Sequence, residues 1–440
     1  MDIQQALRNL LDGTASEEEI NLVKSGLSKG QISIGGNVNQ SIVIVGSGNT
    51  VKVTPEAFNR IKALKSNPFQ VTFELIIKDK TREFIGRGYI FSTIQKFLDE
   101  QTKGYFIVEG DPGMGKSSLL AEYIRRTDCA NHFNSRVNGI TRTSQFLESI
   151  TYQLTSRYNL DYKSPPKDPI RFNSFLIDLL QNVSSSLKQG EKLVIAVDAL
   201  DEIDPEDVLS GRNILSLPQL LPEKVYFIVT QRRGAHLPFM VNTPIETFDL
   251  LKHLSEGRID VVEFLENVIK INEIEKWYVN RGMNGSEFIN VLAEKSENNF
   301  MYLRYVLLDI SKGFYETLGV KDVPTGLQGY YESHWNLMGM KSKPVPKDKI
   351  KIVYLLAESR QPISRALIAN FAKESELTVQ LVLNEWEQFL HRHPKENHMR
   401  YGFYHASFKE FLHRKDIIQA AGVSIDGINA LIANTLWDEW

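Results

Sequence analysis

A glycine-rich stretch at residues 110–117 has residue types and spacing that suit phosphate binding. It reads Gly-Asp-Pro-Gly-Met-Gly-Lys-Ser and fits the pattern G-x-x-x-x-G-K-[ST]. An apolar run at 105–108 predicts a buried strand before it, and a helix is predicted over 118–126 after it. In that setting backbone N–H groups close around phosphate oxygens at a helix N-terminus, and Lys116 reaches the β- and γ-phosphates. The predicted nucleotide-binding residues are Gly110, Asp111, Pro112, Gly113, Met114, Gly115, Lys116, Ser117 and Ser118.

A second apolar run, 193–197, is followed by carboxylates that are expected to take part in metal binding and catalysis. Ligands of parallel α/β sheets bind at the carboxyl ends of the strands, which places Asp198 beside the predicted phosphate loop. Ser117 and Asp198 are predicted to hold Mg²⁺, the carboxylate through a water molecule. Asp201 or Glu202 is then placed to orient or deprotonate an attacking water. The alternative for these two residues is a solvated acidic loop.

A third apolar run, 225–229, ends in the polar and cationic sequence Thr230-Gln231-Arg232-Arg233. Arg232 is predicted to sense the γ-phosphate and is the fifth catalytic candidate beside Lys116 and the three carboxylates; the alternative is a surface ion pair. The sequence contains no Asn-Lys-x-Asp motif that would read guanine, which favours adenine. The expected ligands are therefore ATP and ADP with Mg²⁺.

The elements that position these residues follow from the hydrophobic pattern. Strand and helix patterns alternate from residue 81 to about 233, which predicts a parallel α/β sheet. The stretch 248–311 has helical periodicity, and the Met and aromatic residues at 300–303 are predicted to be core. A Pro- and Lys-rich linker is predicted at 341–349. A winged helix is predicted after it, from three helical patterns near 349–358, 365–373 and 377–390, a strand at 399–403 and a helix that begins at 408.

The N-terminal region has a different pattern. Residues 2–30 predict two short helices, and 32–51 repeat β-branched runs and Gly-Asn turns at a ten-residue period. This repeat predicts either a β-hairpin or a short β-solenoid. The expected domains are an adaptor module at 1–54, a linker helix at 55–80, a P-loop NTPase domain at 81–240, a helical domain at 241–345, a winged-helix domain at 346–425 and the start of a further helical segment at 426–440.

Composition narrows the possible functions. The 440 residues carry 51 basic and 54 acidic side chains, a net charge of -3, so no overall positive field indicates a nucleic-acid or membrane partner. The single cysteine, Cys129, excludes a disulfide framework and is predicted to be inert packing. No signal peptide or apolar run of membrane-spanning length occurs, so the expected location is the cytoplasm.

Taken together, these motifs resemble the NACHT-type branch of the STAND signalling ATPases over most of the chain. Asp198 followed by a small residue and the Asp201-Glu202 pair is similar to the NACHT magnesium-binding motif. The segment Phe84-Ile85-Gly86-Arg87 resembles the leader motif that lies against the nucleotide base. His132-Phe133-Asn134-Ser135-Arg136 is similar to the strand between the two nucleotide motifs. Tyr404-His405-Ala406-Ser407-Phe408-Lys409-Glu410-Phe411-Leu412 resembles the winged-helix signature H-x-S-F-x-E-F-L.

The resemblance implies an ATP-dependent switch that hydrolyses slowly and forms homo-oligomers in the ATP state. In the family, the histidine that corresponds to His405 reaches the β-phosphate of ADP and locks the closed state; from chemistry alone, a core or capping histidine is the alternative. Residues 1–54 resemble effector-associated domains, which recruit a separately encoded effector, and the implied output is antiviral defence or programmed cell death. Relatives continue into sensor repeats, whereas this sequence stops at Trp440, so the sensor of the unknown trigger ligand is absent, separately encoded or removed.

Two other functions fit part of the pattern. A DNA-binding AAA+-like ATPase or transcriptional regulator also combines a Gly-Arg leader, a phosphate loop and a winged helix. The third winged-helix segment, 377–390, has Glu385 and Glu387 but no lysine or arginine, which argues against DNA binding. A scaffold with a degenerate nucleotide site is the third possibility, and the intact Lys116, Ser117 and Asp198 argue against it.

Overall fold

The computed structural model describes residues 32–35, 42–45, 49–52, 69–160, 165–313, 315, 319–359, 361–395 and 398–438. The chain forms two compact units, one made of residues 1–75 and 148–164 and the other of residues 76–147 and 165–440. In the first unit, strands β1 (Ile32–Gly35), β2 (Ile42–Val45) and β3 (Asn49–Lys52) pair antiparallel in the order β1-β2-β3. Antiparallel pairing matches the hairpin alternative and differs from the parallel rungs of a solenoid. The helices predicted over 2–30, and the linker helix up to residue 68, lie outside the described residues.

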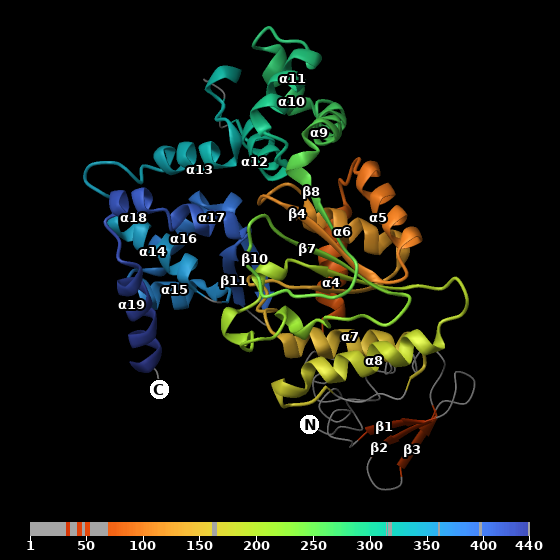
Figure 1. Ribbon diagram of the computed structural model, residues 1–440. Helices are drawn as coiled ribbons and strands as arrows, with labels where there is room; N and C mark the ends of the chain where they lie inside the picture. The colour runs from red at the N-terminus through yellow and green to blue at the C-terminus, as the bar shows by residue number, and fades with distance from the viewer. Residues whose placement is uncertain are drawn as a thin grey trace. The chain divides into compact units, whose positions relative to one another are not determined.

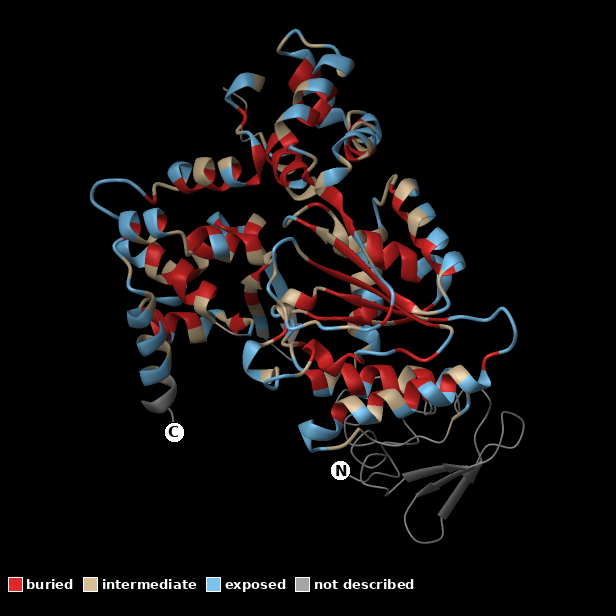
Figure 2. Ribbon diagram, in the orientation of Figure 1, coloured by how far each residue is buried: buried red, intermediate tan, exposed pale blue. Residues whose placement is uncertain are grey.

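The second unit contains a five-stranded parallel sheet, which confirms the predicted fold class. Its strands are β4 (Gly104–Gly110), β5 (Ala130–Phe133), β6 (Leu193–Asp198), β7 (Val225–Arg232) and β8 (Ile245–Asp249). They lie in the order β5-β6-β7-β4-β8. The three central strands are almost entirely buried (Figure 2), as their continuous apolar runs predicted.

Two corrections concern this sheet. Strand β8 pairs with β4, so the sheet extends past the expected boundary at residue 240, and Phe248 lies in this strand and not in a helix. Its sequence, Ile-Glu-Thr-Phe-Asp, is too short and polar to predict a strand from periodicity alone. Strand β5 ends at Phe133, so Asn134, Ser135 and Arg136 of the expected strand follow it as a loop.

Helices α5 (Gly88–Glu100), α6 (Lys116–Thr127) and α8 (Phe172–Ser186) lie in the same unit as the sheet, whereas α4 (Gln70–Thr81) and α7 (Thr143–Arg157) each run from one unit into the other. Figure 1 shows α6 and α8 on opposite faces of the sheet. This follows from right-handed crossovers, because the chain moves outward from β4 to β5 through α6 and returns toward β6 through α8. Strand β7 therefore lies between the strand that leads into the phosphate loop and the strand that ends in Asp198.

A helical segment, residues 254–337, follows the sheet. It comprises α9 (Leu254–Val268), α10 (Asn272–Val279), α11 (Gly285–Ser296), α12 (Phe300–Ser311) and α13 (Gly326–Leu337). Asn284 caps α11 in a capping box with Glu287, and Asn299 caps α12 by accepting a hydrogen bond from the backbone N–H of Tyr302. The cap at Asn299 fixes the start of α12 beside the phosphate loop, as described below.

A C-terminal segment, residues 347–438, completes this unit. It comprises α14 (Lys347–Glu358), β9 (Ile363–Ser364), α15 (Arg365–Ala372), α16 (Glu376–Glu385), β10 (Leu390–Lys395), β11 (His398–Phe403), α17 (Ala406–Leu412), α18 (Lys415–Ala421) and α19 (Ile425–Asp438). The three strands form an antiparallel sheet in the order β10-β11-β9. Two expectations change: helix α14 begins inside the predicted linker, and α16 ends at Glu385 and not at residue 390. Helix α19 forms where a further helical segment was expected, and it packs against α14 and α15.

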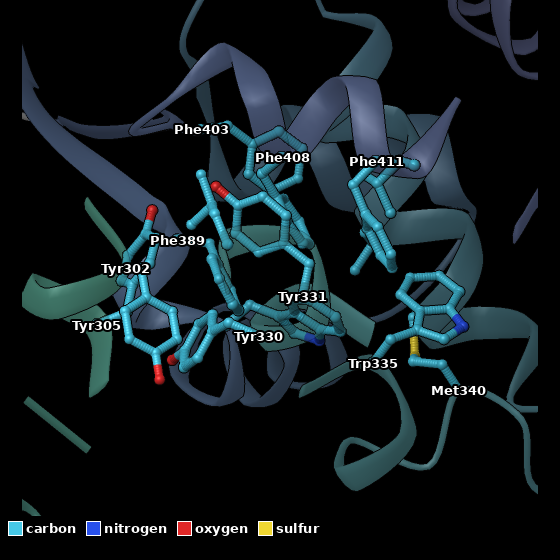
Figure 3. Close-up of a cluster of buried hydrophobic side chains, with 14 of the residues drawn as sticks. Tyr302, Tyr305, Tyr330, Tyr331, Trp335, Met340, Phe389, Phe403, Phe408 and Phe411 are labelled. Carbon is cyan, nitrogen blue, oxygen red and sulfur yellow. The ribbon is translucent and has the colours of Figure 1, made fainter. Parts of the chain in front are cut away.

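A cluster of aromatic side chains joins the helical segment to the C-terminal segment (Figure 3). Tyr305 of α12 stacks on Tyr330 of α13 with ring centroids 5.2 Å apart, and Phe389 stacks on Phe408 of α17 at 4.4 Å. Tyr331 of α13 contacts Phe408 edge to face at 5.1 Å. Such ring pairs add to the free energy of apolar burial, so the two segments share one core.

Two further observations concern the described residues. None of their helices is by itself long and apolar enough to cross a membrane; α18 and the first part of α19 reach that length only as a pair bent by 66°. Cys129 is buried, as its assignment to packing predicted.

Candidate functional site

The phosphate loop connects the end of β4 to the first turn of α6, as the sequence predicted. Gly113 has a φ of +86°, and a Cβ atom there would lie 2.3 Å from the Oδ1 atom of Asn299, so only glycine fits. The Lys116 ammonium donates hydrogen bonds to the carbonyl oxygens of Gly110 (2.6 Å) and Asp111 (3.1 Å). Within the loop, the Met114 sulfur accepts a hydrogen bond from the backbone N–H of Asp111. The lysine is therefore held over the loop.

The predicted metal ligands lie together at the carboxyl ends of the strands. The Thr230 hydroxyl of β7 donates a 2.5 Å hydrogen bond to Oδ1 of the buried Asp198, and Ser117 also hydrogen-bonds this carboxylate. Burial raises the pKa of Asp198, while the Thr230 and Ser117 hydroxyls, and then Lys116, oppose the shift. A cation bound beside Asp198 would stabilise the ionised carboxylate that burial disfavours.

Arg232 lies between two carboxylates from different parts of the chain. The strand register pairs it with Gly110, the first residue of the phosphate loop. Its guanidinium forms an ion pair with Asp201 at 2.8 Å, and its backbone N–H donates to the same carboxylate at 3.0 Å. A second ion pair joins Arg232 to Glu410 of α17. Arg232 therefore pairs both with a carboxylate of the site and with a half-exposed carboxylate of the C-terminal segment.

Glu202 has a different environment from Asp201. Its Oε2 atom accepts a 2.8 Å hydrogen bond from the backbone N–H of Arg136, in the loop after β5. Burial raises the pKa of Glu202; the hydrogen bond from Arg136 opposes this rise, and the neighbouring Asp201 and Asp198 charges add to it. The structure thus distinguishes the two acids that the sequence left as alternatives, because Asp201 is ion-paired with Arg232 whereas the Glu202 carboxylate accepts a hydrogen bond from a backbone N–H.

The leader segment contacts the phosphate loop through Arg87. Phe84 and Ile85 precede the turn at Gly86, and the Phe84 ring packs against Phe91 of α5 at 6.0 Å. The buried Arg87 guanidinium donates a 2.5 Å hydrogen bond to the carbonyl oxygen of Met114. Arg87 thereby joins the leader to the loop.

The helical segment completes this contact with residues that the sequence did not indicate. Asp260 of α9 accepts a hydrogen bond from the Arg87 backbone N–H at 3.1 Å and lies 3.5 Å from its guanidinium. The Phe300 ring of α12 lies under the same guanidinium, with the Arg87 Cζ atom 5.1 Å from the ring centroid. The Asn299 amide donates to the carbonyl oxygen of Pro112 at 2.8 Å.

Residues 300–303 belong to the core, as expected, and two of them also contact the phosphate loop and the leader. Tyr302 and Leu303 are buried, but the Met301 backbone N–H donates to the Gly113 carbonyl and Phe300 contacts Arg87. The sequence contained one signal for Asp260: it is a carboxylate that immediately precedes Val261, within the apolar face of the helix that became α9.

His405 has the geometry of the capping alternative. It is the N-cap of α17, and its Nδ1 atom accepts a hydrogen bond from the backbone N–H of Ser407 at 3.2 Å. Burial lowers the pKa of His405 to about 3, and the cations Lys80, Arg232 and Lys116 act in the same direction. The histidine therefore lies in the electrostatic field of the phosphate-loop lysine, and the cap leaves its Nε2 atom available for another contact.

The adjacent Tyr404 joins the C-terminal segment to two further elements. Its hydroxyl accepts hydrogen bonds from Lys80 of α4 at 3.1 Å and from Arg304 of α12 at 2.8 Å. Both cations also lie over its ring, 4.9 and 4.7 Å from the centroid. Tyr404, His405 and Glu410 thus place one edge of the C-terminal segment beside the phosphate loop and the start of α12.

The donor set fits a nucleotide with Mg²⁺. A tight loop with glycines at positive φ opens a helix whose first N–H groups lack intrahelical partners, and an ammonium, a hydroxyl and a buried carboxylate surround it. Ser117 and Asp198 are the residues that would hold the metal, because hard cations take oxygen ligands. The structure thus brings together the loop, the three acids, Arg87, Arg232 and His405.

Comparison with known proteins gives three findings. Residues 83–229, about a third of the chain, match the family described as AAA ATPase domain. No curated protein matches the sequence. Among solved structures, one similar chain is the Signal Transduction ATPase with Numerous Domains (STAND) protein with a tetratricopeptide repeat sensor from Pyrococcus horikoshii, at 14% identity and a TM-score of 0.40. That match covers 81% of this chain but only 45% of the Pyrococcus horikoshii chain.

A second similar structure is that of Drosophila ORC bound to DNA, at 14% identity and a TM-score of 0.33, covering 79% of this chain and 98% of that one. The matched residues 83–229 include the phosphate loop, the three acids and β7 up to Val229. Sequence motif, fold and family match therefore agree on a P-loop nucleotide-binding domain, whose residues 83–229 are similar to the AAA ATPase domain family.

Proposed function

We propose that this chain is a STAND-type, nucleotide-dependent ATPase switch of the NACHT branch, in which the C-terminal segment is a winged helix that closes over the nucleotide site. The observation that carries the proposal is the contact of that segment with the site: Glu410 pairs with Arg232, and His405 lies in the field of Lys116. A C-terminal segment that only bound DNA, or only served as a scaffold, would not need to contact β7, the strand beside the one that leads into the phosphate loop.

In this proposal the chain binds ATP or ADP through the phosphate loop. The Lys116 ammonium and the N–H groups of the first turn of α6 stabilise the phosphate charge. Ser117 and Asp198 hold Mg²⁺, which when bound neutralises charge that develops on the phosphate oxygens. Arg87 fixes the loop against α9 and α12, so the helical segment is part of the binding site.

Hydrolysis in this proposal depends on Glu202. A general base needs a carboxylate that is ionised but not neutralised by a cation, and a raised pKa brings its basicity closer to the working pH. Glu202 meets this requirement because burial raises its pKa and its carboxylate accepts a hydrogen bond from a neutral backbone N–H. Asp201 is instead paired with Arg232, which makes it a positioning residue.

Closure in this proposal depends on which nucleotide is present. Arg232 lies opposite Gly110, so a γ-phosphate competes with Glu410 for the same guanidinium, whereas ADP leaves the Arg232–Glu410 ion pair intact. His405 adds a hydrogen-bond donor to the β-phosphate in the closed state. ADP therefore favours the closed arrangement and ATP the open one, as a switch requires when each ligand prefers one state.

The proposed output follows from opening. An open chain exposes surfaces through which it forms homo-oligomers, and clustering residues 1–54 increases their effective concentration for a separately encoded effector. The resemblance to NACHT proteins supports a role in antiviral defence or programmed cell death.

The test begins with the nucleotide that the purified protein retains. After denaturation, the released nucleotide is identified by chromatography, and the mass of the native protein is measured in solution with ADP and with a non-hydrolysable ATP analogue. Bound ADP in a monomer that assembles with the analogue supports the switch. Lys116→Ala should lose the nucleotide, and His405→Ala should release ADP faster. A monomer with both nucleotides, or a gain of duplex-DNA affinity with ATP, would contradict the proposal and favour a DNA-binding ATPase.

A further inference from the structure

The hydrogen bonds around His405 define the position of its proton. Nδ1 receives the Ser407 backbone N–H at 3.2 Å, and an amide N–H can only donate. Nδ1 is therefore the acceptor nitrogen of a neutral imidazole, and the ring proton is on Nε2. Within the part of the chain that the structure describes, no group accepts a hydrogen bond from Nε2.

The Ser407 side chain must then donate to the same nitrogen. Its Oγ atom lies 2.6 Å from Nδ1, and because Nδ1 has no proton, the hydroxyl supplies it. Ser407 has only one hydroxyl proton, so its second contact, with the Tyr331 hydroxyl at 2.8 Å, must be one in which Tyr331 donates. The proton donations run in one direction, from Tyr331 to Ser407 and from Ser407 to His405.

Both supporting residues are buried in the core that the helical segment and the C-terminal segment share. Tyr331 and Ser407 are 0% and 1% exposed, and Figure 3 shows Tyr331 among the rings between α13 and α17. Packing against Phe408 and Phe389 fixes the Tyr331 ring and with it the position of its hydroxyl oxygen beside Ser407. Leaving a buried donor or acceptor unpaired is costly. Donation from Tyr331 to Ser407 and from Ser407 to His405 is therefore favoured over donation in the opposite direction.

We propose that Tyr331 and Ser407 are positioning residues that hold His405 as a neutral imidazole with its proton on Nε2, ready to donate a hydrogen bond to a nucleotide phosphate. This inference rests on the proposed function, because it assigns the means by which the winged-helix histidine senses ADP. It also makes α13, which is far from the phosphate loop in sequence, part of the nucleotide-sensing apparatus.

The first test is spectroscopic and needs no nucleotide. The 440-residue chain is labelled with ¹⁵N at its nine histidines, and the His405 signals are assigned by their loss in His405→Gln. The wild type should show a pyridine-type shift for Nδ1 and a pyrrole-type shift for Nε2. Ser407→Ala and Tyr331→Phe should move both signals part of the way toward the average of the two tautomers, because the Ser407 backbone N–H still donates to Nδ1 while the hydroxyl is lost in the first variant and free to turn away in the second. Tyr354→Phe is the matched control, because it removes a buried hydroxyl that donates to the Leu412 carbonyl instead, and it should leave the signals unchanged.

The second test measures the rate of ADP release from the same variants. Removing one buried hydrogen bond should speed release by about 2- to 10-fold in Tyr331→Phe and Ser407→Ala. Tyr354→Phe should release ADP at the wild-type rate while losing comparable thermal stability, which separates positioning from a general loss of packing.

The outcomes separate this inference from the proposed function. If His405→Ala speeds ADP release while Tyr331→Phe and Ser407→Ala change neither the release rate nor the ¹⁵N shifts, the inference is wrong and the switch stands. If His405→Ala releases ADP at the wild-type rate, the phosphate contact fails, and with it the assignment of a sensing role. A proton on Nδ1 in the wild type overturns the inference directly.

Discussion

Arg232, at the end of β7, forms an ion pair with Glu410 of α17, 178 residues further along the chain. Arg232 also pairs in register with Gly110 and binds Asp201. The ion pair with Glu410 therefore brings the C-terminal segment to the edge of the phosphate site. The register of Arg232 with Gly110 follows from the pairing of β7 with β4 in the observed strand order.

Removing the Glu410 charge should accelerate ADP release. In Glu410→Gln the closed arrangement loses an ion pair whose carboxylate is about half exposed, so we expect release to be about 2- to 5-fold faster and the effect to shrink at high salt. Stopped-flow fluorescence with a labelled ADP measures this rate. Glu376→Gln is the matched control, since it breaks an ion pair with Arg365 inside the C-terminal segment and should leave release unchanged. Equal rates in Glu410→Gln and the wild type would contradict the closing role.

Gly86→Ala should unfold or severely destabilise the junction between the leader and α9. Gly86 has a φ of +72°, and a Cβ atom there would lie 2.0 Å from the Asp260 Oδ1 that accepts the Arg87 backbone N–H. We expect a loss of at least about 2 kcal/mol in the free energy of unfolding, together with loss of nucleotide binding. Gly88→Ala, where a Cβ would meet nothing within 4 Å, should be neutral or slightly stabilising. Thermal unfolding with and without ADP distinguishes the two variants.

Glu202→Gln and Asp201→Asn should affect hydrolysis differently. The first removes the proposed base and should slow ATP hydrolysis by about 100-fold or more, with ATP affinity nearly unchanged. The second leaves the base but frees Arg232 from its partner, so it should alter nucleotide affinity more than the rate of the chemical step. Single-turnover hydrolysis and equilibrium binding of ATP give the two quantities. Full hydrolysis in Glu202→Gln, with none in Asp201→Asn, would reverse the assignment.

Stability should fall between pH 4 and pH 7 because of Asp309, a buried carboxyl on α12. Burial raises the pKa of Asp309 from 3.8 to about 6, although the Tyr330 hydroxyl donates to it at 2.7 Å. Because this pKa is raised in the folded state, the folded chain binds the proton more tightly than the unfolded chain does. The stabilisation that comes from this protonation is complete below pH 3.8 and is lost as the pH rises through 6. The loss amounts to up to about 3 kcal/mol.

Comparison with Asp309→Asn isolates this group. As the pH rises from 4 to 8, the free energy of unfolding of Asp309→Asn, taken relative to that of the wild type, should increase by up to about 3 kcal/mol. Tyr330→Phe removes a hydrogen bond that lowers the pKa of Asp309, so the loss should extend to higher pH in that variant. A difference that is constant with pH would contradict the assignment.

The sequence predicted the parts of the site that depend on local patterns. The phosphate loop, Asp198 and Arg232 lie at the ends of buried apolar runs, and the order of runs along the chain placed all three at one edge of a parallel sheet. The strands β4, β6 and β7 are confirmed because fully buried parallel strands are continuously apolar. The motif after residue 404 likewise appears as the start of α17.

The other site residues could not be predicted, because contacts between residues far apart in sequence bring them to the site. Asp260 lies 173 residues from Arg87, and Asn299 lies 187 residues from Pro112. On its own, each of these side chains fits an ordinary helical pattern, so periodicity could not show that it faces a nucleotide site. The choice between Asp201 and Glu202 also needed the structure, because only the position of Arg232 reveals which carboxylate is neutralised.

The position of Arg232 also constrains the thermodynamics of the molecule. In the proposed switch, this one side chain contacts both the phosphate site and α17, so nucleotide occupancy and domain arrangement are coupled through it. Such coupling is reciprocal: the factor by which closure tightens ADP binding must equal the factor by which ADP favours closure. Any partner that binds the C-terminal segment and withdraws Glu410 would therefore act as a nucleotide-exchange factor, without touching the nucleotide.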